Sequence, residues 1–199
     1  MQQALRHLKS SDPILKQIIG QVGPYAIQYR PADFSTLVRS IVYQQISGKA
    51  AVTVIGRMVA TCGKLTPTSI LRLTPEELRA CGLSGQKASY IRDLAEKTRS
   101  RQLRFPPLAA LSDDEVVGHL TQVKGIGVWT AQMFLMFALQ RYDILPTADL
   151  GIRAAMKRAY QLEALPKPEE MIEIAKPWRP WATVASWYLW RSLDGSAEI

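Results

Sequence analysis

The stretch VKGIGVWTA (residues 123–131) decides the fold of the region around it. Two glycines separated by one residue stand directly before an apolar run that continues to Leu139, and this run predicts a buried helix from Val128. Upstream, SDDE (residues 112–115) has the pattern of a capping box, so a helix should begin there and end near Gln122. The local pattern is therefore a helix, a short glycine turn and a second helix.

The glycine turn is suited to binding an anion. Gly125 and Gly127 permit positive φ and leave no Cβ in the way of a ligand. The first amides of the following helix have no partner within the helix and carry the positive end of its dipole, which favours a phosphate oxygen. A helix C-cap followed by a tight connection explains the same glycines, and on local pattern alone both interpretations stay open. A dinucleotide-binding loop fits poorly, because no strand precedes the turn and the third glycine is missing.

A single carboxylate follows further along the chain, in PTADLGIR (residues 146–153). Asp149 stands directly before a helix predicted over residues 150–160, where an N-cap is the ordinary interpretation. A carboxylate at a helix N-terminus tends to stay ionised, so a capping role is compatible with a chemical one. Asp113 and Asp114 fit the capping box upstream, which leaves Asp149 as the better candidate for chemistry.

The composition favours a polyanionic partner. The 199 residues include 25 Lys and Arg against 17 Asp and Glu, which gives a net charge of +8. A merely soluble basic protein would show the same balance. No apolar run is long enough to span a bilayer, and the first thirteen residues lack the apolar core of a signal peptide, so we expect no membrane association. Cys62 and Cys81 are expected to be reduced.

The rest of the chain predicts helices throughout, so the fold class is all-α. No segment alternates as a strand would. The expected elements are an apolar helical run over residues 34–62 that breaks near 44–49, a capping box at TPEE (74–77), an amphipathic helix over 87–98, a connection at Pro106 and Pro107, a helix over 169–176, and a final aromatic helix starting at Pro180.

Four blocks, in order, carry a resemblance that covers nearly the whole chain. SIVYQQISGKAA (40–51), VKGIGVWTA (123–131), PTADLGIR (146–153) and KPWRPW (176–181) with YLW (188–190) together resemble the helix-hairpin-helix/Gly-Pro-Asp superfamily of DNA glycosylases, in its alkylation-repair branch. The resemblance implies two helical subdomains with a cleft between them. Residues 33–140 would carry the helix-hairpin-helix, and residues 1–32 with 141–199 would form the second subdomain.

The activity implied by this resemblance is base excision repair by a monofunctional DNA glycosylase. Such an N-glycosyl hydrolase releases alkylated purines, such as 3-methyladenine and 7-methylguanine, and leaves an abasic site. Asp149 matches the family's catalytic aspartate, which would stabilise an oxocarbenium-like sugar and orient or deprotonate water. Bifunctional relatives place a Schiff-base lysine two residues after the second hairpin glycine. Trp129 occupies that position here and cannot be that nucleophile, which predicts a monofunctional enzyme.

Aromatic residues suggest how a damaged base would be bound. The family comparison places Trp129 and Trp190 as walls of the base pocket, whereas we expect Trp187 to be core packing. Alkylated purines of this kind carry positive charge, and an electron-rich ring face attracts a cation. Such a base also leaves without prior protonation, so one carboxylate with aromatic walls suits this chemistry better than it suits a neutral lesion.

The resemblance also implies which residues contact DNA. The target base must leave the stack before it is cut, and Gln45 is at the family's wedge position, where some relatives have leucine. A polar helix break explains the same segment equally well. Lys87, among other basic residues, would contact phosphates or simply form a solvated surface. The full set of expected DNA contacts is Gln44, Gln45, Ser47, Gly125, Gly127 and Val128.

Cofactor expectations follow from the same comparison. The family hairpin often binds a monovalent cation, Na⁺ or K⁺, through main-chain carbonyls, which here would be those of Thr121, Val123 and Ile126. No cofactor is expected to be required for the reaction. Related enzymes hold an iron–sulfur cluster with four cysteines, and the two cysteines of this chain exclude such a site.

The expected partner is double-stranded DNA containing alkylated bases, bound by a monomer. We expect the protein to be cytoplasmic and associated with the nucleoid if bacterial, and nuclear if eukaryotic. The first alternative is a non-catalytic helix-hairpin-helix module, which would not need Asp149 in its proline context. The second is a helical protein-interaction domain with incidental basic charge, against which DNA affinity that falls steeply with salt would argue.

Overall fold

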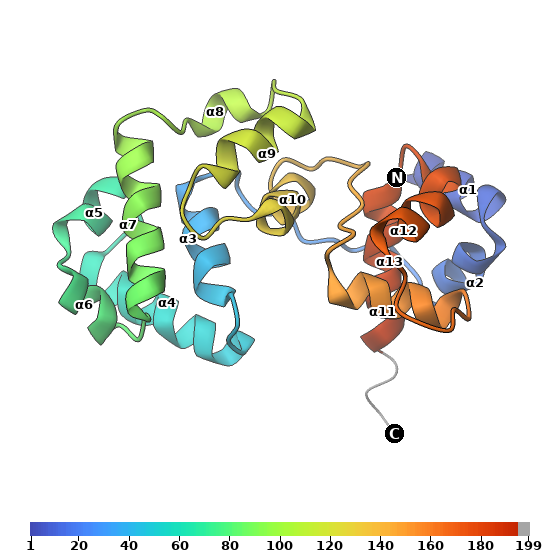
Figure 1. The fold of residues 1–199 in the computed structure, drawn as a ribbon, viewed down its shortest axis with the longest axis horizontal. Coiled ribbons are helices and arrows are strands. Elements are labelled where there is room, and N and C mark those ends of the chain that lie inside the picture. Colours follow the sequence, from blue (N-terminus) through green and yellow to red (C-terminus); the bar gives the residue numbers. More distant parts are fainter. Residues whose placement is uncertain (195–199) are drawn as a thin grey trace. The chain divides into compact units, whose positions relative to one another are not determined.

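The computed structural model describes residues 1–194, and in this part of the chain every regular element is a helix. The chain divides into two compact units (Figure 1). One consists of residues 30–139, and the other of residues 1–29 with the chain from Gln140 onward. The first unit thus begins three residues before, and ends one residue before, the range 33–140 that the sequence predicts. No helix among the described residues is long and apolar enough to cross a membrane.

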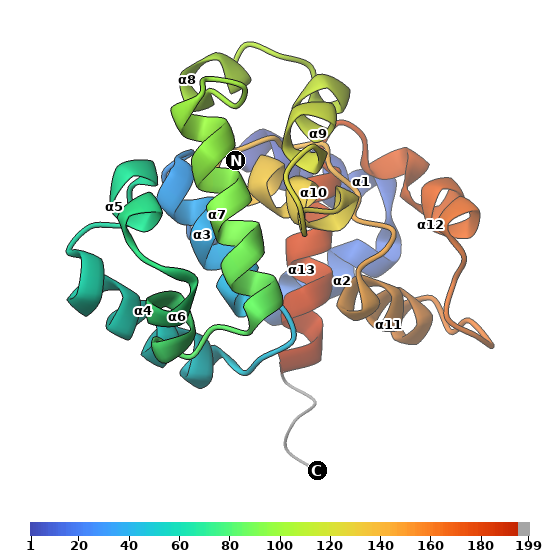
Figure 2. The same ribbon diagram turned by 60° about the vertical axis from the view of Figure 1, so that its left-hand side comes forward.

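The unit of residues 30–139 is built around one long helix, α7 (Gly85–Arg99). Helices α3, α5 and α6 all pack on α7, and Figure 2 shows α7 crossing in front of α3. Helix α3 also packs on α4, and α9 packs on α10. The bounds are α3 (Phe34–Tyr43), α4 (Gly48–Cys62), α5 (Pro67–Arg72), α6 (Pro75–Ala80), α8 (Phe105–Leu108), α9 (Asp113–Thr121) and α10 (Val128–Phe137).

Several of these helices begin at the capping residues that the sequence predicts. Thr74 and Glu77 form the predicted capping box of α6, and Ser112 and Glu115 form that of α9. The expected break in the first apolar run is confirmed, because α3 ends at Tyr43 and α4 begins at Gly48. Each cap satisfies amides that the first turn of a helix leaves without a partner.

Three boundaries differ from the sequence-based expectation. Pro106 and Pro107 do not mark a plain connection but lie inside the short helix α8, since the first turn of a helix tolerates proline. The final helix begins at Ala182 rather than at Pro180. Helix α10 ends at Phe137, although the apolar run continues to Leu139, and its first two residues are exposed rather than buried.

The other unit packs both ends of the chain around the final helix, α13 (Ala182–Asp194). Helix α13 packs on α2 and α11, and α1 packs on α2 and on the short 3₁₀ helix η1. The bounds are α1 (Gln2–Ser11), α2 (Pro13–Val22), α11 (Leu150–Ala159), α12 (Pro168–Ala175) and η1 (Lys176–Trp178). Trp178 and Trp187 are both buried in this core, which confirms the packing interpretation of Trp187.

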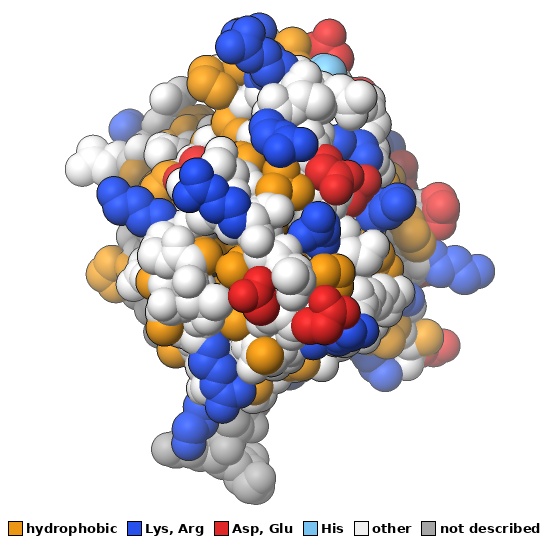
Figure 3. Space-filling model, turned by 90° about the vertical axis from the view of Figure 1, so that its left-hand side faces the viewer, with side chains coloured by type: hydrophobic (Ala, Val, Ile, Leu, Met, Phe, Trp, Pro, Cys, Tyr) orange, Lys and Arg blue, Asp and Glu red, His pale blue; other side chains and the backbone are white. Residues whose placement is uncertain are grey.

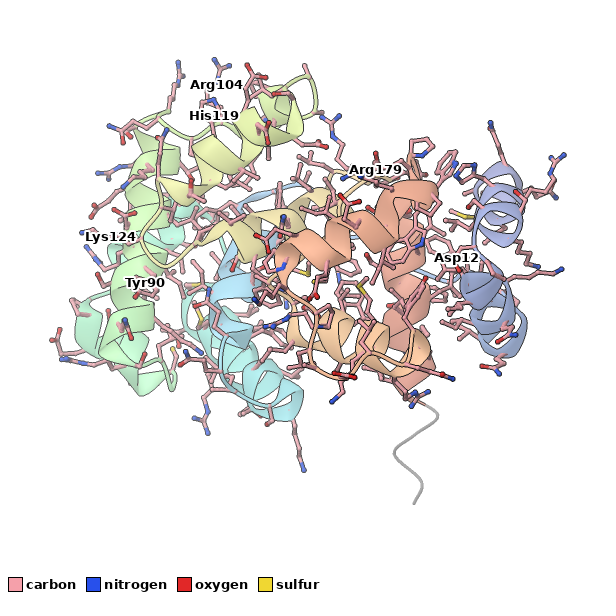
Figure 4. All side chains as sticks on the ribbon, turned by 45° about the vertical axis from the view of Figure 1, so that its right-hand side comes forward. Asp12, Tyr90, Arg104, His119, Lys124 and Arg179 are labelled. Atoms are coloured by element: carbon pink, nitrogen blue, oxygen red, sulfur yellow. The ribbon has the colours of Figure 1, made fainter. Side chains whose placement is uncertain are left out.

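A buried carboxylate joins the parts of this unit. Asp12 lies between α1 and α2 (Figure 4) and is 5% exposed. Its Oδ1 accepts from the amides of Ile14 (2.8 Å) and Leu15 (3.0 Å), and its Oδ2 accepts from the Tyr160 hydroxyl and from the Trp178 indole at 2.8 Å. Burial, and then the adjacent Asp12, raise the pKa of Tyr160 above its ordinary value. All these donors lose their acceptor if Asp12 is removed.

We therefore expect Asp12→Ala to reduce the free energy of unfolding by roughly 3 kcal/mol, since it removes an N-cap and leaves buried donors without an acceptor. Urea unfolding followed by circular dichroism measures this loss. Asp33→Ala is the matched control, because Asp33 also caps a helix, α3, but binds no buried aromatic donor. It should cost roughly 1 kcal/mol. Equal losses in the two variants would show that the network around Asp12 adds nothing to its cap.

Candidate active site

The turn between α9 and α10 requires glycine at residue 125. Gly125 has φ +77°, a conformation that L side chains rarely adopt. A Cβ added to it would also lie 2.0–2.5 Å from ring carbons of Tyr90, on α7. Gly125 therefore allows both the turn itself and the close approach of its backbone to the Tyr90 ring.

The second glycine differs from the first in its backbone conformation. Gly127 has φ −92° and ψ 176°, extended backbone that any residue adopts, so the positive φ that glycine permits is used only at Gly125. Nothing lies within 4 Å of the position that a Cβ would take. Gly127 is the N-cap of α10 and provides no side-chain cap, while Val128 and Trp129 are 55% and 41% exposed. The N-terminus of α10 is therefore exposed, and its N-cap residue supplies no side-chain acceptor to the first amides of the helix.

Helix α7 fixes the backbone of the hairpin turn through Asp93. The amide of Lys124 donates to Asp93 Oδ2 at 2.9 Å, and Lys97 Nζ lies 2.6 Å from Asp93 Oδ1. Burial acts to raise the pKa of Asp93, but Lys97 and the Lys124 amide together hold it below its ordinary value. Figure 4 labels Tyr90 on α7 and Lys124 in the turn. The backbone of the turn is thus fixed to a helix of the same unit before any ligand binds.

The expected wedge segment is the loop between α3 and α4, residues 44–47, which we call the wedge loop. Gln45 is exposed and has φ +56°, so it stands at the tip of the loop in a left-handed conformation. Ser47 caps α4 by accepting from the Ala50 amide at 3.3 Å. Gln44 is half-buried, and its Nε2 donates to the Gly125 carbonyl at 2.9 Å. The side chain of Gln44, expected at DNA, therefore binds the hairpin.

Lys87 also differs from the expectation of a phosphate contact or a solvated charge. Its Nζ donates to the carbonyls of Val42 (2.7 Å) and Gln44, at the C-terminal end of α3. Burial lowers the pKa of Lys87. On the face that carries α5, α6 and α7, the Lys and Arg side chains are dispersed, with Asp and Glu among them (Figure 3).

A cavity of about 720 Å³ opens beside the hairpin, between α3 and α10. Trp129 and Phe137 from α10 and Tyr43 from α3 are among its aromatic walls. Arg30 and Arg39 also line it, and no local sequence pattern groups them with Trp129. An apolar wall with a few polar groups is typical of a small-molecule or base-binding site. The structure therefore places Trp129 at a cavity, as a base-pocket residue would be.

Asp149 is buried at the N-terminus of α11. Its Oδ1 accepts from the Ile152 amide at 2.8 Å, which confirms the N-cap, and from Trp190 Nε1 at 2.9 Å. A Cβ at Gly151 would lie 3.1 Å from both Asp149 Oδ1 and the Trp190 indole, so glycine leaves room for the indole to reach the carboxylate. Trp190 was expected only as a pocket wall. The structure shows that it fixes the orientation of Asp149.

The carbonyls expected to bind a cation belong to the end of α9 and to the turn. Thr121 is the last residue of α9, and Val123 and Ile126 are buried in the turn that follows. The Ile126 amide donates to the Val123 carbonyl at 3.1 Å, which uses one of the two acceptor positions of that oxygen. Oxygen donors of this kind suit a hard cation such as Na⁺ or K⁺, so these residues fit the expected group.

Two helices joined by a glycine turn, with an exposed helix N-terminus after it, are the arrangement of a helix-hairpin-helix protein that binds DNA. An aromatic cavity lies beside the turn, and the second unit contributes the Asp149 carboxylate. The family profile described as "HhH-GPD superfamily base excision DNA repair protein" matches residues 38–180. The chain belongs to this superfamily.

Relatives of known name agree with this assignment. DNA-3-methyladenine glycosylase 1 of Schizosaccharomyces pombe is 33% identical over 94% of this chain and 85% of its own length. The solved structure of a 3-methyladenine DNA glycosylase from the same organism, in complex with abasic DNA, superposes with a TM-score of 0.86 at 32% identity, covering 96% of this chain and 97% of that one. A DNA-3-methyladenine glycosidase from Bacillus halodurans gives 0.87 at 35% identity, over 98% and 91%.

The open N-terminus of α10 leads to a binding prediction. Gly127→Asp places a carboxylate where a phosphate would bind, and we expect affinity for all DNA sequences to fall by roughly 10-fold or more. Aspartate is a good N-cap, so stability should be unchanged or slightly higher. Fluorescence anisotropy with lesion-containing and undamaged duplexes at two salt concentrations measures the effect.

Gly127→Ala is the control that separates bulk from charge, and it should lose less affinity because its Cβ enters open space. Unchanged affinity of a folded Gly127→Asp variant for both duplexes would show that the hairpin is only a connection between helices.

Proposed function

We propose that this protein is a monofunctional DNA glycosylase of base excision repair. It hydrolyses the N-glycosidic bond of alkylated purines, such as 3-methyladenine and 7-methylguanine, and leaves an abasic site. Family membership and the names of the similar proteins support this activity. The observation that carries it is the Asp149 carboxylate, buried and held by the Ile152 amide and the Trp190 indole in the segment that resembles the family's catalytic one.

Asp149 supplies the charge that the reaction needs. As the bond between base and sugar breaks, positive charge develops on the sugar, and a fixed carboxylate stabilises it without having to reorient. The two hydrogen bonds to Oδ1 provide that fixed orientation. The same carboxylate orients the attacking water or accepts its proton.

The base contributes its own activation. Alkylation at a ring nitrogen gives the purine a positive charge, so it leaves as a neutral molecule and no second protein acid is required. Trp129, on the cavity wall, offers an aromatic face that attracts the cationic base. Base binding by the cavity and sugar stabilisation by Asp149 are separate contributions to one reaction.

The remaining assignments concern DNA contacts, the cation and the assembly. The amides at Gly125, Gly127 and Val128 bind a phosphate, and Gln45 fills the space that the extruded base leaves. The carbonyls of Thr121, Val123 and Ile126 would hold Na⁺ or K⁺, whose charge would attract the same phosphate; the reaction itself requires no cofactor. The protein acts on double-stranded DNA as a monomer.

Asp149→Asn tests the chemical role. The amide keeps the shape and still accepts the Ile152 amide, but it is neutral and cannot balance an oxocarbenium-like sugar. We expect base release at saturating enzyme to fall roughly 100-fold or more, while DNA affinity and the unfolding transition change little. Chromatography of bases released from methylated DNA gives the rate. Turnover close to that of the parent would remove Asp149 from the mechanism.

The reaction type has a separate test. Because Trp129 stands at the position of the Schiff-base lysine, products should be abasic sites in intact strands until alkali or an endonuclease is added. Denaturing gels with and without alkali show the strands. Borohydride should trap no covalent enzyme–DNA adduct, with a known lyase as the positive control. Trapping at the level of that lyase would mean that the enzyme is bifunctional.

A further inference from the structure

The wedge loop and the hairpin, far apart in sequence, meet at one hydrogen bond. Gln44 Nε2 donates to the Gly125 carbonyl at 2.9 Å, across 81 positions of the chain. Because a carbonyl only accepts, the NH₂ end of the Gln44 amide must face it. Gln44 directly precedes the exposed Gln45 tip, and Gly125 is the residue with positive φ in the turn before α10. The contact therefore joins the wedge loop to the hairpin.

Helix α7 supports both sides of this contact. Lys87 donates to the carbonyls of Val42 and Gln44, which end α3, and so fixes the start of the wedge loop. One turn along, the Tyr90 ring lies against Gly125, and after another turn Asp93 accepts from the Lys124 amide. The three side chains follow one another at intervals of three residues, and neighbours at that spacing lie on the same side of a helix. Figure 2 shows α7 running beside the end of α3 in this unit.

The conformation of the loop tip explains why it needs such support. Gln45 is not glycine, yet it has φ +56°, and it is exposed, so its own packing does little to hold it there. Its neighbour Ile46 is 39% exposed. On the far side Ser47 caps α4, and on the near side Gln44 and Lys87 hold the backbone. The tip is therefore presented in a fixed conformation by contacts that involve only protein groups.

We propose that Gln44 is a positioning residue that couples base displacement to phosphate anchoring. Through the Gly125 carbonyl it fixes the wedge loop to the hairpin, so that the Gln45 tip and the amides of α10 meet the DNA as one rigid unit. The inference rests on the proposed function, since it assigns Gln44 a part in base extrusion by that site. It replaces the expectation that Gln44 contacts DNA directly.

This coupling predicts a distinctive defect. Gln44→Met keeps the length of the side chain but removes the donor, so the tip is no longer held against the hairpin. Phosphate binding at α10 remains, and affinity for undamaged duplex should stay within about 2-fold of the parent. Extrusion of the base should suffer instead, and base release at saturating enzyme should fall roughly 3- to 10-fold, as expected for one lost hydrogen bond.

The experiment compares the parent with Gln44→Met, Gln45→Ala and the double variant. One duplex carries 2-aminopurine beside a stable abasic analogue, and its fluorescence reports unstacking without chemistry. A second carries 7-methylguanine for single-turnover base release. Gln102→Met is the matched control, because Gln102 is an exposed glutamine away from the loop, and it should behave as the parent. Circular dichroism and thermal unfolding confirm that each variant folds.

The inference requires that Gln44→Met lower both the fluorescence change and the rate, and that Gln45→Ala have little further effect in the Gln44→Met background. It is wrong if Gln45→Ala is impaired while Gln44→Met matches the parent, because the tip then works without the link. It is also wrong if Gln44→Met weakens binding to both duplexes and leaves the saturated rate unchanged, because Gln44 is then an ordinary DNA contact. Parent-like turnover by Asp149→Asn would instead contradict the proposed function.

Discussion

The approach of the Gly125 backbone to the Tyr90 ring is the constraint on which the geometry of the hairpin and the wedge loop depends. No side chain at residue 125 would permit it, because a Cβ would overlap the ring. With the turn pressed on α7, the Lys124 amide reaches Asp93 and the Gly125 carbonyl reaches Gln44. The N-terminus of α10, which we propose binds a DNA phosphate, is thereby preorganised, so the protein would not have to order it on binding.

Most of the fold could be predicted from local sequence signals. Capping residues such as Ser112 and Thr74, and the change from an apolar to a polar pattern after Tyr43, depend on neighbours a few positions away, and these predictions were confirmed. The errors came where the pattern does not specify geometry. A proline such as Pro106 is equally typical of a connection and of the first turn of a helix. An apolar residue such as Val128 is predicted to be buried even where its position at a helix end leaves it exposed.

The candidate site was predictable only in part. Asp149 as an N-cap follows from its position before α11, and Trp129 was placed by a resemblance that spans the chain. The contact between Trp190 and Asp149 was not predictable, because 41 positions separate them and no local pattern brings an indole to a carboxylate. The contacts of Lys87 were not predictable for the same reason. A lysine on an amphipathic helix is expected to be solvated, and the sequence does not show that the carbonyls at the end of α3 lie beside it.

The position of Asp12 has a consequence for the order in which the chain can fold during its synthesis. Residues 30–139 are contiguous, so that unit has all its partners once they have left the ribosome. The first two helices lack their partners at that stage. Asp12 accepts hydrogen bonds from Tyr160 and Trp178, and α2 packs on α13, all of which are made later. The chain must be made as far as α13 before the first two helices can pack in their unit. The unit of residues 30–139, which we propose binds DNA, can thus form first, while the unit that carries Asp149 is completed only after α13 has been made.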